Sequence, residues 1–248
     1  MDRLNKVAKI TVYFWIMKVF ATTLGEIAGD HLSMTSDIGY SVSLAITMGL
    51  FVLVVSIQLS VNRLYTALYW LVIVGSTTAG TEVSDFMDRT LGLGYAWGSL
   101  ILFSLLMLVL YLWHFREKGI RVYPITERRI ELYYWIAILI SNSLGTAFGD
   151  YLTDNMELSY LAGASVTAAI IIIVVLLHYY TKINEILLFW IAFIFTRPFG
   201  ATFGDLLTKP LSKGGLELGT GAAAIVTAVL LSLIIVYTSM KDKNVKIV

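Results

Sequence analysis

The stretch TTLGEIAGD at residues 22–30 decides how this chain of 248 residues is organised, because it returns three more times. The other copies are TTAGTEVSD at residues 77–85, NSLGTAFGD at residues 142–150 and RPFGATFGD at residues 197–205. Each copy ends in Asp, has a Gly five residues earlier, and follows a Trp that lies fifteen residues before the Asp. The sequence therefore predicts four tandem copies of one unit. The matching residues are Trp15, Trp70, Trp135 and Trp190, then Gly25, Gly80, Gly145 and Gly200, then Asp30, Asp85, Asp150 and Asp205.

Composition places these units in a membrane. Hydrophobic residues make up 58% of the chain and charged residues only 14%, with a mean hydropathy of +0.79. Apolar stretches recur that are long enough to cross a hydrocarbon core of about 30 Å at about 1.5 Å per residue. We expect an all-α membrane protein with eight transmembrane helices in one membrane domain, residues 1–248. The expected spans are 10–30, 41–59, 66–85, 94–113, 132–150, 159–180, 185–205 and 218–239.

The units are expected at residues 8–60, 64–114, 130–181 and 184–240, with a linker at residues 115–131. Each unit holds two spans, so the copies share one orientation and are parallel repeats about an axis along the membrane normal. The connections at one side, including both termini, hold most Lys and Arg residues. The other side has only Arg89, Lys209 and Lys213, and is acidic instead. The positive-inside rule therefore predicts cytoplasmic termini. The acidic residues of the outer side are Asp37, Asp88, Asp154, Glu157 and Glu217.

Charge within the membrane is confined to the first span of each unit. Lys18, Glu26, Glu82 and Arg197 lie there, with the four Asp residues at the outer ends. A charge facing lipid costs at least about 2.5 kcal/mol, so these faces should point inward. We therefore expect the odd-numbered spans inside, around a polar interior, and the even-numbered spans facing lipid. At about 100° per residue from each Trp, Glu26 lies at about 20° and Glu82 at about 120° around its helix.

With its four tryptophans and its repeated Gly–Asp stretches, the chain resembles a bacterial membrane-protein family defined by a tandem repeat of unknown function. Members of that family have four copies of a unit with two membrane segments and a characteristic tryptophan. The stretch at residues 77–85 departs most, since its Glu is shifted by one position and Ser84 replaces the second Gly. The resemblance covers nearly the whole chain and implies an eight-span protein of the bacterial inner membrane. It implies no activity.

The conserved spacing of Gly and Trp within the chain allows two interpretations each. Three copies contain a GxxxG pair, which lets helices pack closely. Alternatively, the glycines expose backbone carbonyls or break the helix before the Asp, and Pro198 is expected to kink its span. The tryptophans are either interfacial belt residues or an aromatic layer that closes the interior at the cytoplasmic side.

Carboxylate and hydroxyl oxygens are hard ligands suited to Mn²⁺, Mg²⁺, Ca²⁺, Na⁺ or H⁺, so the leading hypothesis is a cation transporter. The metal ligands expected are Glu26, Asp30, Glu82 and Asp205. Lys18 lies about 12 Å from Glu26 along one helix, so its partner should come from another unit. The full predicted ion- or substrate-binding set is Lys18, Thr23, Glu26, Asp30, Thr78, Glu82, Asp85, Asn142, Ser143, Asp150, Arg197 and Asp205.

Two alternatives stay open. The chain could carry a small anionic or organic solute bound by Arg197 and Lys18, or it could be a non-transporting scaffold or sensor whose charges form structural salt bridges. The chain has no Cys, and its three His residues form no metal-binding pair. No phosphate-binding or nucleophile motif is present, so we expect no enzyme, no cofactor and no nucleic-acid partner. The expected partners are the lipid bilayer and an inorganic cation or small solute, and an oligomer is possible.

Overall fold

The computed structural model describes residues 5–35 and 38–245, and within this part it is all-helical with no strand. The prediction of an all-α chain with eight helices is confirmed. Arg3, Asp37 and Lys246 lie outside the described residues, as do the side chains of Lys213, Lys241 and Lys243. The helices are α1 (Val12–Asp30), α2 (Tyr40–Ser60), α3 (Thr66–Asp85), α4 (Tyr95–Glu117), α5 (Arg128–Asp150), α6 (Tyr160–Tyr180), α7 (Glu185–Thr208) and α8 (Thr220–Val245).

Five of the described helices, α2, α4, α6, α7 and α8, are long and apolar enough to cross a membrane by length and composition. The other three, α1, α3 and α5, have 19, 20 and 23 residues, so they are of similar length. They are less apolar because they carry the polar and small residues of the repeated stretches. The buried residues of α5, for example, include Ser141, Asn142, Ser143 and Thr146.

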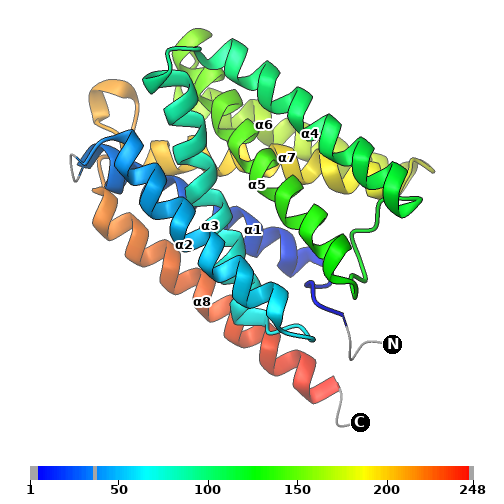
Figure 1. Ribbon diagram of the computed structural model, residues 1–248. Coiled ribbons are helices and arrows are strands. Elements are labelled where there is room, and N and C mark those ends of the chain that lie inside the picture. Colours follow the sequence, from blue (N-terminus) through cyan, green and yellow to red (C-terminus); the bar gives the residue numbers. More distant parts are fainter. Residues whose placement is uncertain (1–4, 36–37, 246–248) are drawn as a thin grey trace.

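The four odd-numbered helices form a closed ring, in which α1 packs on α3, α3 on α5, α5 on α7, and α7 back on α1. The even-numbered helices lie outside this ring (Figure 1). Each packs mainly on the first helix of the next unit, so that α2 covers α3, α4 covers α5 and α6 covers α7, while α8 of the last unit covers α1 of the first. The units are therefore interlocked, and contact between the last and first units closes the bundle.

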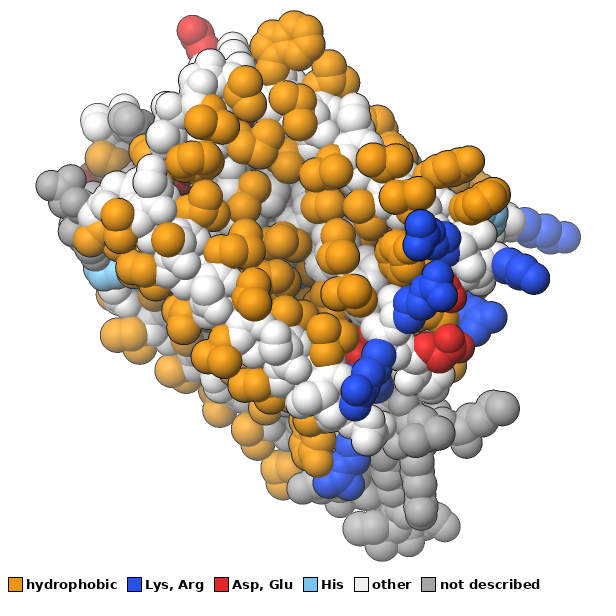
Figure 2. All heavy atoms as spheres, in the orientation of Figure 1, with side chains coloured by type: hydrophobic (Ala, Val, Ile, Leu, Met, Phe, Trp, Pro, Cys, Tyr) orange, Lys and Arg blue, Asp and Glu red, His pale blue; other side chains and the backbone are white. Residues whose placement is uncertain are grey.

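The outer helices present an apolar surface. Exposed side chains include Leu53 on α2, Trp97 on α4 and Ile172 on α6, with 57%, 64% and 59% of their surface accessible. Figure 2 shows this apolar surface along the helices, with Lys and Arg side chains gathered at one end of the molecule. So large an apolar exterior suits hydrocarbon rather than water, and is that of a membrane protein.

We call the end with the Lys and Arg side chains the basic end. The opposite end of the ring, where α1, α3 and α5 each finish at an Asp, is the aspartate end. There the helices continue into short π-helical turns, η2 (His31–Thr35), η3 (Phe86–Thr90) and η4 (Tyr151–Asn155). α7 instead runs three residues past Asp205 and is followed by the 3-10 turn η5 (Leu211–Lys213). π-Helical turns are often found at functional sites.

The repeated glycines are the closest contact points of the ring. A Cβ atom on Gly25 would lie 2.0 Å from Thr77 Oγ1, and one on Gly200 would lie 2.1 Å from Thr22 Oγ1. The Cβ positions of Gly80 and Gly145 are crowded in the same way, by Asn142 and Arg197 of the next inner helix. Each inner helix is continuous through its glycine. The structure therefore places these glycines at helix contacts rather than at breaks before the Asp residues.

Candidate functional site

A buried ion pair lies at the centre of the ring. Arg197 on α7 donates from Nη2 to Oε2 of Glu26 on α1 at 2.6 Å, and to Oγ1 of Thr81 on α3 at 2.5 Å. Thr81 Oγ1 in turn donates to the same Glu26 oxygen at 3.3 Å. The Arg197 side chain is fully buried, yet its Nε and Nη1 atoms have no hydrogen-bond partner. A buried guanidinium with unused donors can bind a further anionic or polar ligand.

A second polar chain crosses the ring nearer the basic end. The Lys18 ammonium donates to Asn142 Oδ1 at 2.8 Å, and Asn142 Nδ2 donates to Ser76 Oγ at 3.0 Å. The ammonium also lies 3.9 Å from the ring centre of Phe193. Lys18 is therefore held by α5 and α7 rather than by Glu26 of its own helix. Its partner comes from another unit, as the 12 Å spacing on one helix requires.

Two cations bridge the four repeated Asp residues in pairs. Lys209 Nζ lies 2.5 Å from Asp30 Oδ2 and 3.3 Å from Asp205 Oδ1, whereas Arg89 lies 2.9 Å from Asp85 and 3.3 Å from Asp150. Each cation stands four residues after an Asp, in the second and fourth units, and each reaches the Asp of the next unit around the ring. The aspartate end is thus paired two by two, which matches the 120-residue offset between the chain's two halves.

Lys209 lies just beyond α7, and the pKa of its ammonium depends on the neighbouring carboxylates. Burial lowers the pKa of its ammonium, but Asp205 and Asp30 outweigh burial and raise the pKa above the usual value for lysine. A cationic group with a raised pKa stabilises the fold fully below the pKa of the unfolded chain, about 10.4, so this contribution is complete at neutral pH.

Replacing Lys209 with Met is expected to lower the free energy of unfolding by about 1–3 kcal/mol, because two buried carboxylates lose their cation. Thermal unfolding of the purified protein in detergent measures this change. Lys182→Met is the matched control, since Lys182 is an exposed lysine at the basic end. Equal melting of the two variants would show that Lys209 does not hold the aspartate end together.

Three of the four predicted metal ligands come together. Carboxylate oxygens of Glu26, Asp30 and Asp205 all lie within 4.8 Å of one another, and all three residues are buried. We call this group the carboxylate cluster. Glu82 is not part of it and lies against Gly29, where a Cβ atom would be 3.3 Å from Glu82 Oε1. The role of Glu82 as a metal ligand therefore stays a prediction, separate from the carboxylate cluster.

The predicted hydroxyl ligands differ in their hydrogen bonding. Thr78 Oγ1 donates to Val74 O and Ser143 Oγ to Leu139 O, both within their own helices. Thr23 Oγ1 is buried without a hydrogen-bond partner. Of these three hydroxyls, Thr23 alone makes no hydrogen bond within the described interior.

An aromatic layer fills the ring towards the basic end. Phe14, Tyr69, Tyr134 and Phe189 are buried there, and the hydroxyls of Tyr69 and Tyr134 lie 2.6 Å apart. The repeated tryptophans pack against this layer, with ring centres 5.5 Å apart for Phe14 and Trp70. Trp70, Trp135 and Trp190 are buried and Trp15 is half-buried, so a belt facing the interface does not describe them.

Sequence reasoning missed a further ion pair below this layer. Lys6 pairs with Glu131, which also accepts hydrogen bonds from Gln58 at 3.0 Å and from Trp135 at 3.4 Å. The roles of Arg89 and Lys209 were missed as well. Their signal was present, since both stand four residues after a repeated Asp and are exceptions to the positive-inside pattern.

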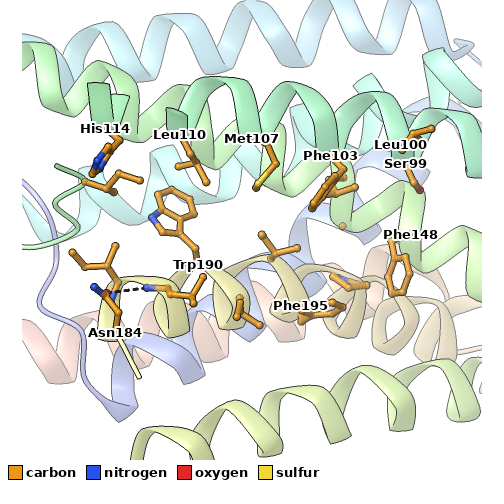
Figure 3. Close-up of a pocket in the computed structure, with 18 of the residues that line it drawn as sticks. Ser99, Leu100, Phe103, Met107, Leu110, His114, Phe148, Asn184, Trp190 and Phe195 are labelled. Atoms are coloured by element: carbon orange, nitrogen blue, oxygen red, sulfur yellow. Dashed lines mark hydrogen bonds between the residues drawn. The ribbon is translucent and has the colours of Figure 1, made fainter. Parts of the chain in front are cut away.

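A large groove on the membrane-facing surface is a different kind of feature. It has a volume of about 1140 Å³ and runs between α4 and α7 over the seam of α5 and α7. Figure 3 shows Phe103, Met107, Leu110 and Phe195 lining it, with Trp190 between the two helices. Its lining is almost entirely apolar, so it suits hydrocarbon chains, and the polar interior remains the candidate site for a charged ligand.

These features define a membrane-type helical bundle built from four interlocked units around a buried ionic interior. Four segments of the chain, residues 13–63, 68–119, 133–184 and 188–244, match the family described as Repeat of Unknown Function (DUF347). The chain belongs to this family, which confirms the resemblance drawn from the Trp, Gly and Asp spacing. No curated protein matches the chain, and no solved structure matches it.

Proposed function

We propose that this protein transports a cation across the cytoplasmic (inner) membrane, through the polar interior lined by α1, α3, α5 and α7. In this proposal all eight helices span the membrane, both termini are cytoplasmic, and the aspartate end faces outward. The observation that carries the proposal is the carboxylate cluster, in which three buried acids from two neighbouring helices converge within 4.8 Å. Oxygen donors of this kind are typical ligands of hard cations.

Charge balance favours a divalent ion such as Mn²⁺. In the closed arrangement Lys209 and Arg197 lie on the carboxylate cluster and neutralise part of its charge. If Lys209 moves away on its flexible side chain, the three carboxylates and Arg197 have a net charge of −2, which one divalent ion neutralises. Lys209 thus acts as a tethered cation that the transported ion displaces at the outer side.

The two closures of the interior fit a transport cycle. Lys209 and Arg89 close the aspartate end through ion pairs, and the aromatic layer closes the opposite end through packing. Alternating access requires that one closure opens while the other holds. Ion binding at the carboxylate cluster would loosen the two ion pairs of Lys209 directly, because Asp30 and Asp205 belong to both the cluster and these pairs.

The flux test uses proteoliposomes and a panel of Mn²⁺, Mg²⁺, Ca²⁺, Na⁺, H⁺ and small anions. Glu26→Gln and Asp205→Asn are expected to lower Mn²⁺ flux at sub-saturating concentration at least about tenfold. Loss of one charged ligand costs about 1.5–3 kcal/mol, and 1.4 kcal/mol is a factor of ten in affinity. Glu157→Gln, an exposed acid at the aspartate end, is the matched control and should transport like the wild type. Cation flux that survives both cluster substitutions would overturn the proposal.

A second candidate function rests on the unused donors of Arg197. Its Nε and Nη1 atoms are buried without partners, and Lys18 supplies another buried cation in the same interior. Such a pair suits a small anionic solute. Flux of anions alone, lost in Arg197→Gln, would favour this candidate, whereas a folded protein with no flux of any ion would favour a scaffold or sensor.

A further inference from the structure

Glu82 is a buried acid that the carboxylate cluster does not use. Its side chain is fully buried on α3, and neither carboxylate oxygen has a hydrogen-bond partner. Among the described residues it forms no ion pair, in contrast to Glu26 and the four repeated Asp residues. A charged carboxylate buried without a cation is strongly unfavourable, so a cation or a proton is expected to bind there.

The surroundings of Glu82 supply further oxygen donors. The hydroxyls of Ser43 on α2 and Ser33 in η2 lie near its carboxylate, but neither makes a hydrogen bond of full geometry with it. Ser43 Oγ is itself buried without a partner, and Ser33 Oγ donates to Gly29 O at 2.9 Å, which leaves its lone pairs available. Because Gly29 has no side chain, α1 leaves space beside Glu82 Oε1. Glu82, Ser43 and Ser33 therefore form a small oxygen-lined site between α1, α2 and η2, which we call the Glu82 site.

The charges around this site favour a cation. The charged groups that act on Glu82 from α1 are Glu26 and Asp30, which are both acidic, and α2 places the Ser43 hydroxyl near it. The site also lies beside the C-terminal end of α1, where the helix dipole is negative. We infer that the Glu82 site binds one Na⁺ ion. A single carboxylate balances one monovalent charge, whereas the carboxylate cluster with its two excess charges suits a divalent ion.

The Glu82 site is joined to the cluster through consecutive residues of α3. Thr81 precedes Glu82 and bonds both Glu26 and Arg197. A shift of α3 on Na⁺ binding would therefore move Thr81 and change its contacts with Glu26 of the carboxylate cluster and with Arg197. This coupling rests on the proposed function, in which a Na⁺ gradient would drive transport of the divalent ion. Binding of Na⁺ at the Glu82 site does not depend on that function.

The test measures binding without transport. The purified full chain is melted in detergent while NaCl or KCl replaces choline chloride at constant ionic strength, between pH 6 and pH 8. We expect a saturable rise of the melting temperature with Na⁺, little rise with K⁺, and no rise in Glu82→Gln. Ser43→Ala keeps the charge but loses a ligand, and is expected to need about tenfold more Na⁺. Glu157→Gln should respond like the wild type.

Several outcomes would overturn the inference. These are a wild type that melts alike in Na⁺ and choline, a Na⁺ response that persists in Glu82→Gln, or a response to pH alone that Glu82→Gln abolishes, which would assign the site to a proton. If Glu82→Gln does not fold, an unchanged Na⁺ requirement in Ser43→Ala would overturn it equally. Na⁺ stabilisation without divalent flux would leave this site standing while the proposed function falls, and Mn²⁺ flux without Na⁺ stabilisation would do the reverse.

Discussion

Replacing Arg197 with Gln is expected to lower the free energy of unfolding by about 3–5 kcal/mol, because Glu26 would remain buried as a charge without its cation. Glu26 would keep only the hydroxyl of Thr81, 3.3 Å away. The loss should be among the largest of any single substitution, since the guanidinium is fully buried and contacts α1 and α3 at once. Thermal unfolding of the purified protein in detergent measures it.

The partner substitution distinguishes charge from packing. Glu26→Gln alone should also destabilise the protein, but the double variant Glu26→Gln with Arg197→Gln should regain most of the lost stability. Removal of both charges leaves no uncompensated ion, so the cycle should show a coupling energy of about 1–3 kcal/mol. Arg116→Gln, at an exposed position of α4, is the control and should melt like the wild type. Strictly additive losses would mean that the ion pair contributes little and that Arg197 acts mainly through its packing on Gly145.

The inner ring was predictable from the sequence, because the evidence for it is periodic. Trp, Gly and Asp recur at fixed offsets, and intramembrane charge occurs only on the first helix of each unit. Measured from the Trp of each copy, the helical angles of Glu26 and Glu82 differ by about 100°, which indicates that the two side chains face different neighbours. The carboxylate cluster and the Glu82 site follow that division.

The outer arrangement was not predictable in the same way. The even-numbered helices are mostly apolar, and the few polar residues that they turn inward, such as Ser43 and Thr47 of α2, do not indicate which inner helix they will meet. That α2 covers α3, and that α8 returns to α1, is decided by three-dimensional packing. The same holds for the pairs of Arg89 with Asp150 and of Lys209 with Asp30. These pairs join neighbouring units, and the sequence alone does not give the order of the units around the ring.

The glycine contacts lead to the second large expected effect. Gly200→Ala is expected to destabilise the protein by about 1–3 kcal/mol through overpacking, and Gly200→Leu to prevent assembly of the ring. The added Cβ would lie 2.1 Å from Thr22 Oγ1 and 3.0 Å from the Thr23 backbone nitrogen. Thr22 cannot turn aside easily, because its side chain is β-branched and its hydroxyl is bonded within α1 at 2.8 Å and 3.0 Å.

Gly49→Ala is the matched control, because a Cβ on this α2 glycine meets no atom within 4 Å. In a helix, Ala is favoured over Gly by about 1 kcal/mol, so this variant should melt at the same temperature as the wild type or higher. The two glycine substitutions should therefore have opposite signs, although both exchange one hydrogen for one methyl group in a helix. If Gly200→Ala proved neutral, α1 and α7 would have to separate without cost. The contact that brings Glu26 and Arg197 together would then not be set by the small residues of the repeat.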